Sequence, residues 1–87
     1  MPVGELDSHV ASPGDRLTSF HGNGLHDGRF FVEVNTETKL SARTNQLEPN
    51  AEFVLPQPFM LSDGDEVKLF VETDEDPNEY TGRLVIE

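Results

Sequence analysis

Residues 66–73 read EVKLFVET and decide the fold more than any other stretch of the chain. Successive side chains of a β-strand point to opposite faces, so this alternation predicts a strand with one buried face. The residues predicted to point inward are Val67, Leu69 and Val71. A second run, residues 79–87, alternates in the same way around Gly82 and directs inward Tyr80, Leu84 and Ile86. The two runs together predict an antiparallel hairpin.

Acidic residues crowd this part of the chain. From Asp63 to Glu87 there are nine carboxylates and two cations, so the segment carries −7 of a net charge of −11. Three explanations stay open: a solvated surface that keeps the protein soluble, adaptation to high salt, and imitation of nucleic acid at a basic partner. The residues predicted to form an acidic binding surface are Asp63, Asp65, Glu66, Glu72, Asp74, Glu75, Asp76 and Glu79.

Short apolar segments separated by turn residues extend this β pattern toward the N-terminus. The aromatic and β-branched run at residues 29–34 predicts a strand, residues 17–20 begin another, and residues 36–44 form an edge strand. Residues 45–50 are predicted to form a turn and residues 51–55 a strand, after which Pro56 and Pro58 require an edge, a bend or a polyproline-like segment. The run at residues 59–61 is apolar enough to be buried, and residues 62–65 form a tight turn.

No stretch of eleven or more residues has the spacing of an amphipathic helix. The predicted fold is therefore all-β, a small antiparallel β-sandwich or partly open barrel. Residues 1–16 mix proline and glycine with polar residues and predict a flexible, irregular arm, which leaves residues 17–87 as a single β domain.

Residues 47–49, Leu-Glu-Pro, followed by Phe53-Val54-Leu55 resemble the corner that precedes a late strand in fibronectin type III modules. The resemblance covers about nine residues, and Phe53 stands where that corner has a tyrosine hydroxyl. The resemblance implies a β-sandwich corner and no function.

Two loops contain residue types that bind metals. Residues 74–78, DEDPN, begin like an EF-hand loop, but the sixth and twelfth places hold Glu79 and Val85 instead of glycine and glutamate. Residues 21–28 contain His21, His26 and Asp27, whose spacing matches no common metal motif. Both loops are therefore predicted to be exposed turns, and no metal or cofactor is expected. A surface site for Ca²⁺ or Zn²⁺ is kept as a third hypothesis.

The chain also lacks the usual signs of an enzyme. It has no cysteine and no G-x-S-x-G motif, and a domain of 87 residues seldom encloses a large ligand pocket. Carboxylates on an exposed hairpin have no desolvation to adapt them for acid catalysis. We therefore expect no catalytic residues.

Charge and hydropathy limit location and partners. A net charge of −11 argues against direct binding of nucleic acid, since such binding depends on lysine and arginine. The N-terminus lacks a signal peptide, and no apolar run is long enough for a bilayer, so we expect no membrane partner. The expected location is the cytoplasm or the interior of a viral particle.

The predicted function is a non-enzymatic protein–protein interaction or structural module, such as a small viral or accessory subunit that docks onto a larger assembly. Phe31, Phe70 and Val85 lie on the strand faces opposite the predicted core, which indicates a second apolar face that must be covered. The expected partner is a protein, which is basic if the acidic residues bind it, and the expected assembly is a homo- or hetero-oligomer. The alternative is an acidic nucleic-acid mimic that inhibits a basic nucleic-acid-binding protein.

Overall fold

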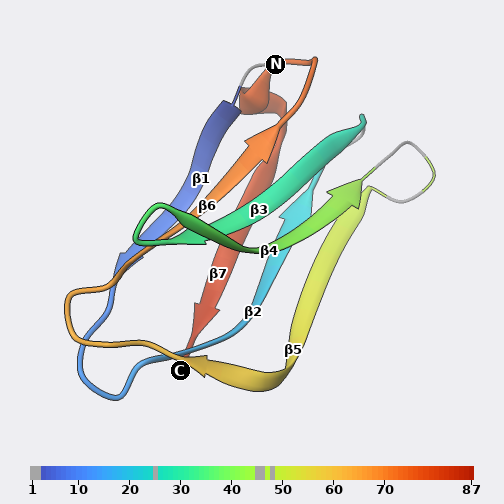
Figure 1. Cartoon of the computed structure of the whole chain (residues 1–87). Coiled ribbons are helices and arrows are strands. Elements are labelled where there is room, and N and C mark those ends of the chain that lie inside the picture. Colours follow the sequence, from blue (N-terminus) through green and yellow to red (C-terminus); the bar gives the residue numbers. More distant parts are fainter. Residues whose placement is uncertain (1–2, 25, 45–46, 48) are drawn as a thin grey trace.

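The computed structural model describes residues 3–24, 26–44, 47 and 49–87 and shows two antiparallel sheets packed face to face (Figure 1). One sheet has the order β1-β6-β3-β4 and the other the order β5-β2-β7. The sheets do not close into a barrel, which confirms the predicted all-β sandwich. The strands are β1 (Val3–Val10), β2 (Arg16–Asn23), β3 (Gly28–Val34), β4 (Glu37–Thr44), β5 (Asn50–Met60), β6 (Glu66–Glu72) and β7 (Thr81–Ile86), with a 3-10 helix η1 (Pro77–Glu79) between the last two.

The core lies between the two sheets. β6 contributes the three residues that the sequence directs inward, and all three are fully buried. Phe30 on β3 meets Tyr80 edge to face, with ring centroids 6.0 Å apart, while Phe20 on β2 stacks on Phe53 of β5 at 6.1 Å. These aromatic contacts supply much of the apolar area that a domain of this size must bury. The other fully buried apolar side chains are Leu17, Val32, Val67, Leu69 and Val71.

The predicted strand at residues 29–34 is confirmed as β3, and the predicted edge strand at residues 36–44 is confirmed as β4, the last strand of its sheet. The tight turn at residues 62–65 is also confirmed, because the Asp65 amide donates a hydrogen bond to the Ser62 carbonyl at 3.0 Å. Of the predicted turn at residues 45–50, residues 45, 46 and 48 lie outside the described part of the chain.

The prediction of an irregular arm over residues 1–16 is wrong for residues 3–10. They form β1, which pairs antiparallel with β6 from Val3 opposite Glu72 to Val10 opposite Glu66. The sequence shows no apolar alternation over this strand, because both of its terminal valines are exposed. Its pairing depends on main-chain hydrogen bonds. β1 is therefore an integral edge strand of the four-stranded sheet.

The prediction of a C-terminal hairpin is also wrong. β6 pairs with β1 and β3, whereas β7 pairs with β2 in the opposite sheet. Both strands have an apolar face, and these faces meet across the core: a Cβ placed on Gly82 of β7 would come 2.8 Å from Leu69 of β6. Alternation in sequence identified the buried faces, but it could not distinguish strands that lie side by side from strands that lie face to face.

β5 shows why the two prolines are tolerated. In the pairing with β2, Val54 lies opposite Ser19 and Phe59 opposite Leu17, so four residues of β5 face the single Thr18. Pro56 and Pro58 fall in this bulge, where no ladder hydrogen bond needs their missing N–H. The expected burial of residues 59–61 holds only for Leu61, since Phe59 and Met60 are 37% and 63% exposed.

On the outer face of the four-stranded sheet, neighbouring side chains cover most of the apolar surface. Phe31 and Phe70 are stacked across β3 and β6, with centroids 5.3 Å apart, and the Arg29 guanidinium lies 4.8 Å from the Phe31 centroid. Phe31 is only 7% exposed as a result. Phe70 is half-buried, and so is Val85, which lies on β7 of the three-stranded sheet. These three residues therefore give less support to assembly than the sequence indicated.

Candidate functional site

The acidic residues predicted as one surface lie in two groups at opposite ends of β6. Asp63 and Asp65 belong to the turn before the strand and Glu66 is its first residue, while the other five belong to its end and to the connection that follows. A strand of seven residues spans about 20 Å. Between the groups, the outer face of β6 carries Lys68 and Phe70, so no continuous row of carboxylates runs along it.

The Asp65 side chain stabilises the turn before β6. Its carboxylate accepts a hydrogen bond from the Ser62 amide at 2.8 Å and another from the Asn35 side chain at 2.9 Å. Hydrogen bonds to the charged form stabilise it, so the Ser62 amide and then Asn35 lower the pKa of Asp65. This residue therefore has a clear structural role.

The acidic residues at the C-terminal end of β6 and in the connection after it make several different kinds of contact. Glu72 lies 3.7 Å from Arg29, and Asp76 caps the helix η1 by accepting the Asn78 amide at 3.0 Å. Pro77 at the start of the helix has no N–H to satisfy, which suits this position. Glu75 and Glu79 are exposed and lie near His26 of the β2–β3 loop.

A buried network of hydrogen bonds fixes the connection between β6 and β7 onto the loop between β2 and β3. The hydroxyls of Tyr80 and Thr73 both donate to the Asp27 carbonyl, at 3.0 and 2.9 Å, and they lie 2.9 Å from each other. The Thr44 hydroxyl donates to the His26 carbonyl at 3.0 Å. Tyr80, Thr73 and Thr44 are each 3% exposed or less. Satisfied buried networks of this kind hold backbone segments in one arrangement.

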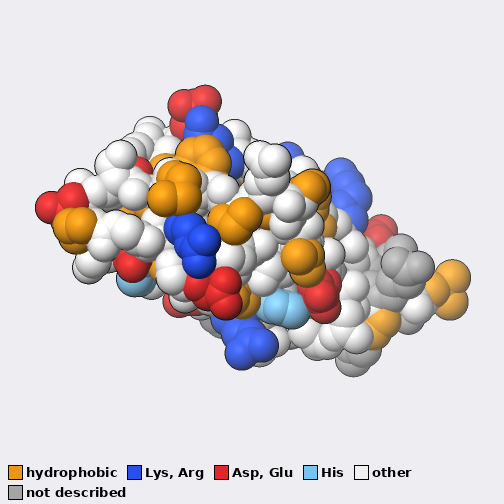
Figure 2. All heavy atoms as spheres, turned by 90° about the horizontal axis from the view of Figure 1, so that it is seen from below, with side chains coloured by type: hydrophobic (Ala, Val, Ile, Leu, Met, Phe, Trp, Pro, Cys, Tyr) orange, Lys and Arg blue, Asp and Glu red, His pale blue; other side chains and the backbone are white. Residues whose placement is uncertain are grey.

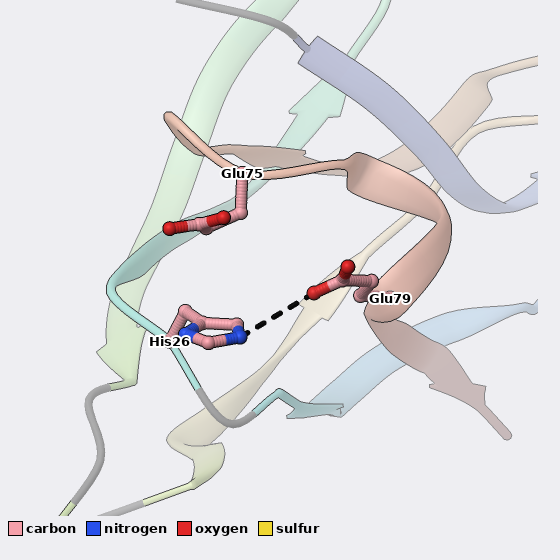
Figure 3. A group of neighbouring side chains, drawn as sticks. All are labelled: His26, Glu75 and Glu79. Carbon is pink, nitrogen blue, oxygen red and sulfur yellow. Dashed lines mark ion pairs between the residues drawn. The ribbon is translucent and has the colours of Figure 1, made fainter.

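This network brings together the β2–β3 loop and the β6–β7 connection, which are two separate loops in the sequence. The imidazole of His26 and the carboxylates of Glu75 and Glu79 offer ligand atoms that all lie within 4.8 Å of one another. Figure 3 shows His26 on one loop facing the two glutamates on the other, with the His26–Glu79 pair marked. No local motif in the sequence indicates this cluster, because 49 or more positions separate its histidine from its carboxylates.

A second histidine lies on the outer face of the three-stranded sheet. His21 on β2 is opposite Glu52 on β5 and Arg83 on β7, and its Nδ1 is 3.4 Å from the Glu52 carboxylate. These residues line a shallow hollow of about 440 Å³ together with Asn23, Asn50 and Thr81. The hollow is open and polar, and it brings together no pair of groups arranged as nucleophile and base.

The edge of the same sheet carries an apolar stretch, of which the sequence predicts only residues 59–61 to be buried. Residues 53–61 contain no charged side chain, in a chain with 17 acids. β5 is the first strand of its sheet and is hydrogen-bonded to β2, and its residues from Pro56 to Met60 are all exposed. In Figure 2, which views the molecule from the end where β5 finishes, hydrophobic side chains gather over the middle of the face. Within residues 52–60 of β5, the exposed apolar residues are Val54, Pro56, Pro58, Phe59 and Met60.

Comparison of the chain with known protein families, with curated proteins and with solved structures gives no match in any of the three. Within the described residues, no helix is both long enough and apolar enough to cross a membrane.

Proposed function

We propose that this protein is a non-enzymatic protein–protein interaction module that docks through the apolar edge formed by residues 53–60 of β5 and Leu61, the residue after it. The single observation that carries the proposal is that this uncharged stretch presents exposed apolar side chains on an edge strand. Solvated edge strands normally carry charges or are covered, since an apolar edge invites association.

The bulge limits how a partner can bind. Pro56 and Pro58 cannot donate main-chain hydrogen bonds, so an added strand could not form a continuous ladder along this part of β5. Contact through side chains is therefore favoured, with the two prolines, Phe59 and Met60 inserted into an apolar groove of the partner. Lys39 lies close to this surface, since its Nζ is 5.8 Å from the Phe59 ring centroid.

The proposed setting is a larger assembly inside a cell or a viral particle, in which the acidic surface keeps the free subunit soluble. A partner with an apolar groove suits β5 better than a purely basic one, because no carboxylate lies within residues 53–61. The alternative of a nucleic-acid mimic stays a prediction. It needs a continuous acidic face, and the acidic residues lie at two ends of β6.

The test is a double substitution, Val54→Lys with Met60→Lys, at two positions that are both 63% exposed. Its matched control is Val3→Lys with Val10→Lys on β1, where the valines are 50% and 65% exposed. Both variants add the same charge to exposed positions, so their folding and solubility should be equal. Partners captured from the native source and self-association by sedimentation are measured for each.

We expect the β5 variant to lose at least about tenfold in affinity for the partner, or to lose self-association, while the β1 variant matches the wild type. A β5 variant that binds as tightly as the wild type would overturn the proposal. A wild-type protein that is monomeric at high concentration and captures nothing would overturn it as well.

A further inference from the structure

We propose that His26, Glu75 and Glu79 form a binding site for a divalent transition-metal ion, with Zn²⁺ as the best-suited member of the class. The three side chains come from two connections, the β2–β3 loop and the segment between β6 and β7, and they lie close together at the surface (Figure 3). The site is distinct from the β5 edge and does not depend on the docking function.

The separation of His26 and Glu79 is compatible with two ligands of one metal ion. Their Nε2 and Oε2 atoms are 3.4 Å apart, which is longer than the usual range of about 2.7–3.2 Å for a hydrogen bond. Two ligands of a tetrahedral zinc ion, each at about 2.1 Å from the metal, lie about 3.3 to 3.4 Å from each other. These two groups therefore already have the spacing of neighbouring ligands.

Glu75 completes the set. Its ligand oxygen is within 4.8 Å of those of His26 and Glu79, and as an exposed side chain it can rotate toward them. Two carboxylates held this close repel each other, and a cation between them removes the repulsion. Three protein ligands leave a fourth position for water on the open side.

The backbone beneath the three ligands is held in place. The Glu75 amide donates to the buried Thr73 hydroxyl at 3.0 Å, and that hydroxyl in turn donates to the carbonyl of Asp27, next to His26. Glu79 lies on η1, which Asp76 caps. The ligands therefore start from fixed backbone positions, which lowers the entropy lost on binding.

The ligand chemistry selects the class of metal. Imidazole nitrogen with carboxylate oxygen suits Zn²⁺ and its transition-metal neighbours, whereas Ca²⁺ and Mg²⁺ prefer sets made of oxygen alone. The neighbouring acids Asp74 and Asp76, exposed on the same connection, add negative potential that attracts a cation. Each of the two connections passes from one sheet to the other, so a bound ion would tie both crossings together.

The experiment measures Zn²⁺ binding by titration calorimetry and by melting temperature on protein without an affinity tag. Variants His26→Ala and Glu79→Gln are compared with the control His21→Ala. His21 is a matched control because it also lies 3.4 Å from a glutamate, Glu52, and within the described residues it has no third ligand of this kind nearby. Circular dichroism of the metal-free variants checks that each one folds.

We expect one equivalent of Zn²⁺ to bind the wild type and to raise its melting temperature in proportion to the logarithm of the free metal concentration. His26→Ala and Glu79→Gln should each weaken binding at least about tenfold, the range found on loss of groups that support a metal site. His21→Ala should stay within about twofold of the wild type, and Ca²⁺ and Mg²⁺ should bind at least about tenfold more weakly than Zn²⁺.

Equal Zn²⁺ affinity in His26→Ala and the wild type would overturn the proposal, as would loss of binding in His21→Ala alone. An absence of saturable binding would also overturn it. Proton NMR gives a second readout if one variant fails to fold: the ring signals of His26, and neither those of His9 nor those of His21, must shift with Zn²⁺.

Discussion

Two aspartates hold equivalent turns at one end of the sandwich. Asp15 accepts the Ser12 amide at 2.9 Å and Asp65 accepts the Ser62 amide at 2.8 Å, in segments that share the pattern Ser-x-Gly-Asp. Gly14 and Gly64 have φ values of 88° and 87°, which only glycine adopts without strain. The turns are also joined to each other, because the Ala11 amide donates to the Asp65 carbonyl and the Leu61 amide to the Asp15 carbonyl.

The pKa values of both aspartates predict how stability depends on pH. The Ser12 amide and then His9 lower the pKa of Asp15, and the Ser62 amide and then Asn35 lower that of Asp65. Below the ordinary value of 3.8 the unfolded chain therefore binds more protons at these sites than the folded protein. Their contribution is complete at neutral pH and is lost as the pH falls through the lowered values.

Urea denaturation at several acidic pH values checks this for Asp65→Asn. We expect the variant to be less stable than the wild type at neutral pH and to approach it as the pH falls toward 2. Asp63→Asn, at an exposed position of the same turn, is the control. A stability difference for Asp65→Asn that does not change with pH would contradict the explanation.

At the scale of elements, glycines of one sheet leave room for side chains of the other. A Cβ added to Gly22 of β2 would come 2.5 Å from the Phe30 ring of β3, which is fully buried. The Phe30 ring of one sheet therefore packs directly against the Gly22 backbone of the other. A methyl group at this position must displace a core aromatic residue or separate the sheets.

We expect Gly22→Ala to lower the free energy of unfolding by about 1–3 kcal/mol, the usual cost of overpacking. Chemical denaturation of a double-mutant cycle with Phe30→Leu measures it. The smaller leucine should relieve part of the clash, so Gly22→Ala should cost less in the Phe30→Leu background. Equal costs in the two backgrounds would show that the clash with Phe30 is not the cause.

At the scale of the whole molecule, the net charge of −11 sets six cations against 17 acids. Among the described residues, the ion pairs Lys68–Glu5 and Arg29–Glu72 are each 3.7 Å long and join side chains that remain about one third to one half exposed. Exposed pairs contribute little to stability, so repulsion among the unpaired carboxylates dominates the electrostatic free energy.

Salt screens this repulsion, so the melting temperature at pH 7 should rise between about 20 mM and about 500 mM NaCl, as the Debye length falls below about 10 Å. Near the isoelectric point of about 4.4 the same change in salt should have a much smaller effect. Thermal denaturation at both pH values tests this. A melting temperature that falls with salt at pH 7 would mean that attractive ion pairs outweigh the repulsion.

The sequence by itself determined the all-β class and the buried faces of individual strands, including Val67, Leu69 and Val71. It could do so because burial of one face imposes a period of two on the residues of a strand. It also located the edge strand β4 and the Ser62–Asp65 turn, whose signals are local.

Only the tertiary structure decided which strands are neighbours. Main-chain hydrogen bonds, which are the same for every residue type, pair β1 with β6 and place β6 and β7 in different sheets. The candidate sites depend on those pairings. The β2–β3 loop meets the β6–β7 connection only after both sheets form, and this contact alone brings His26 to Glu75 and Glu79. The bulge that exposes Phe59 and Met60 likewise comes from the register of β5 against β2, which no alternation of residues along β5 specifies.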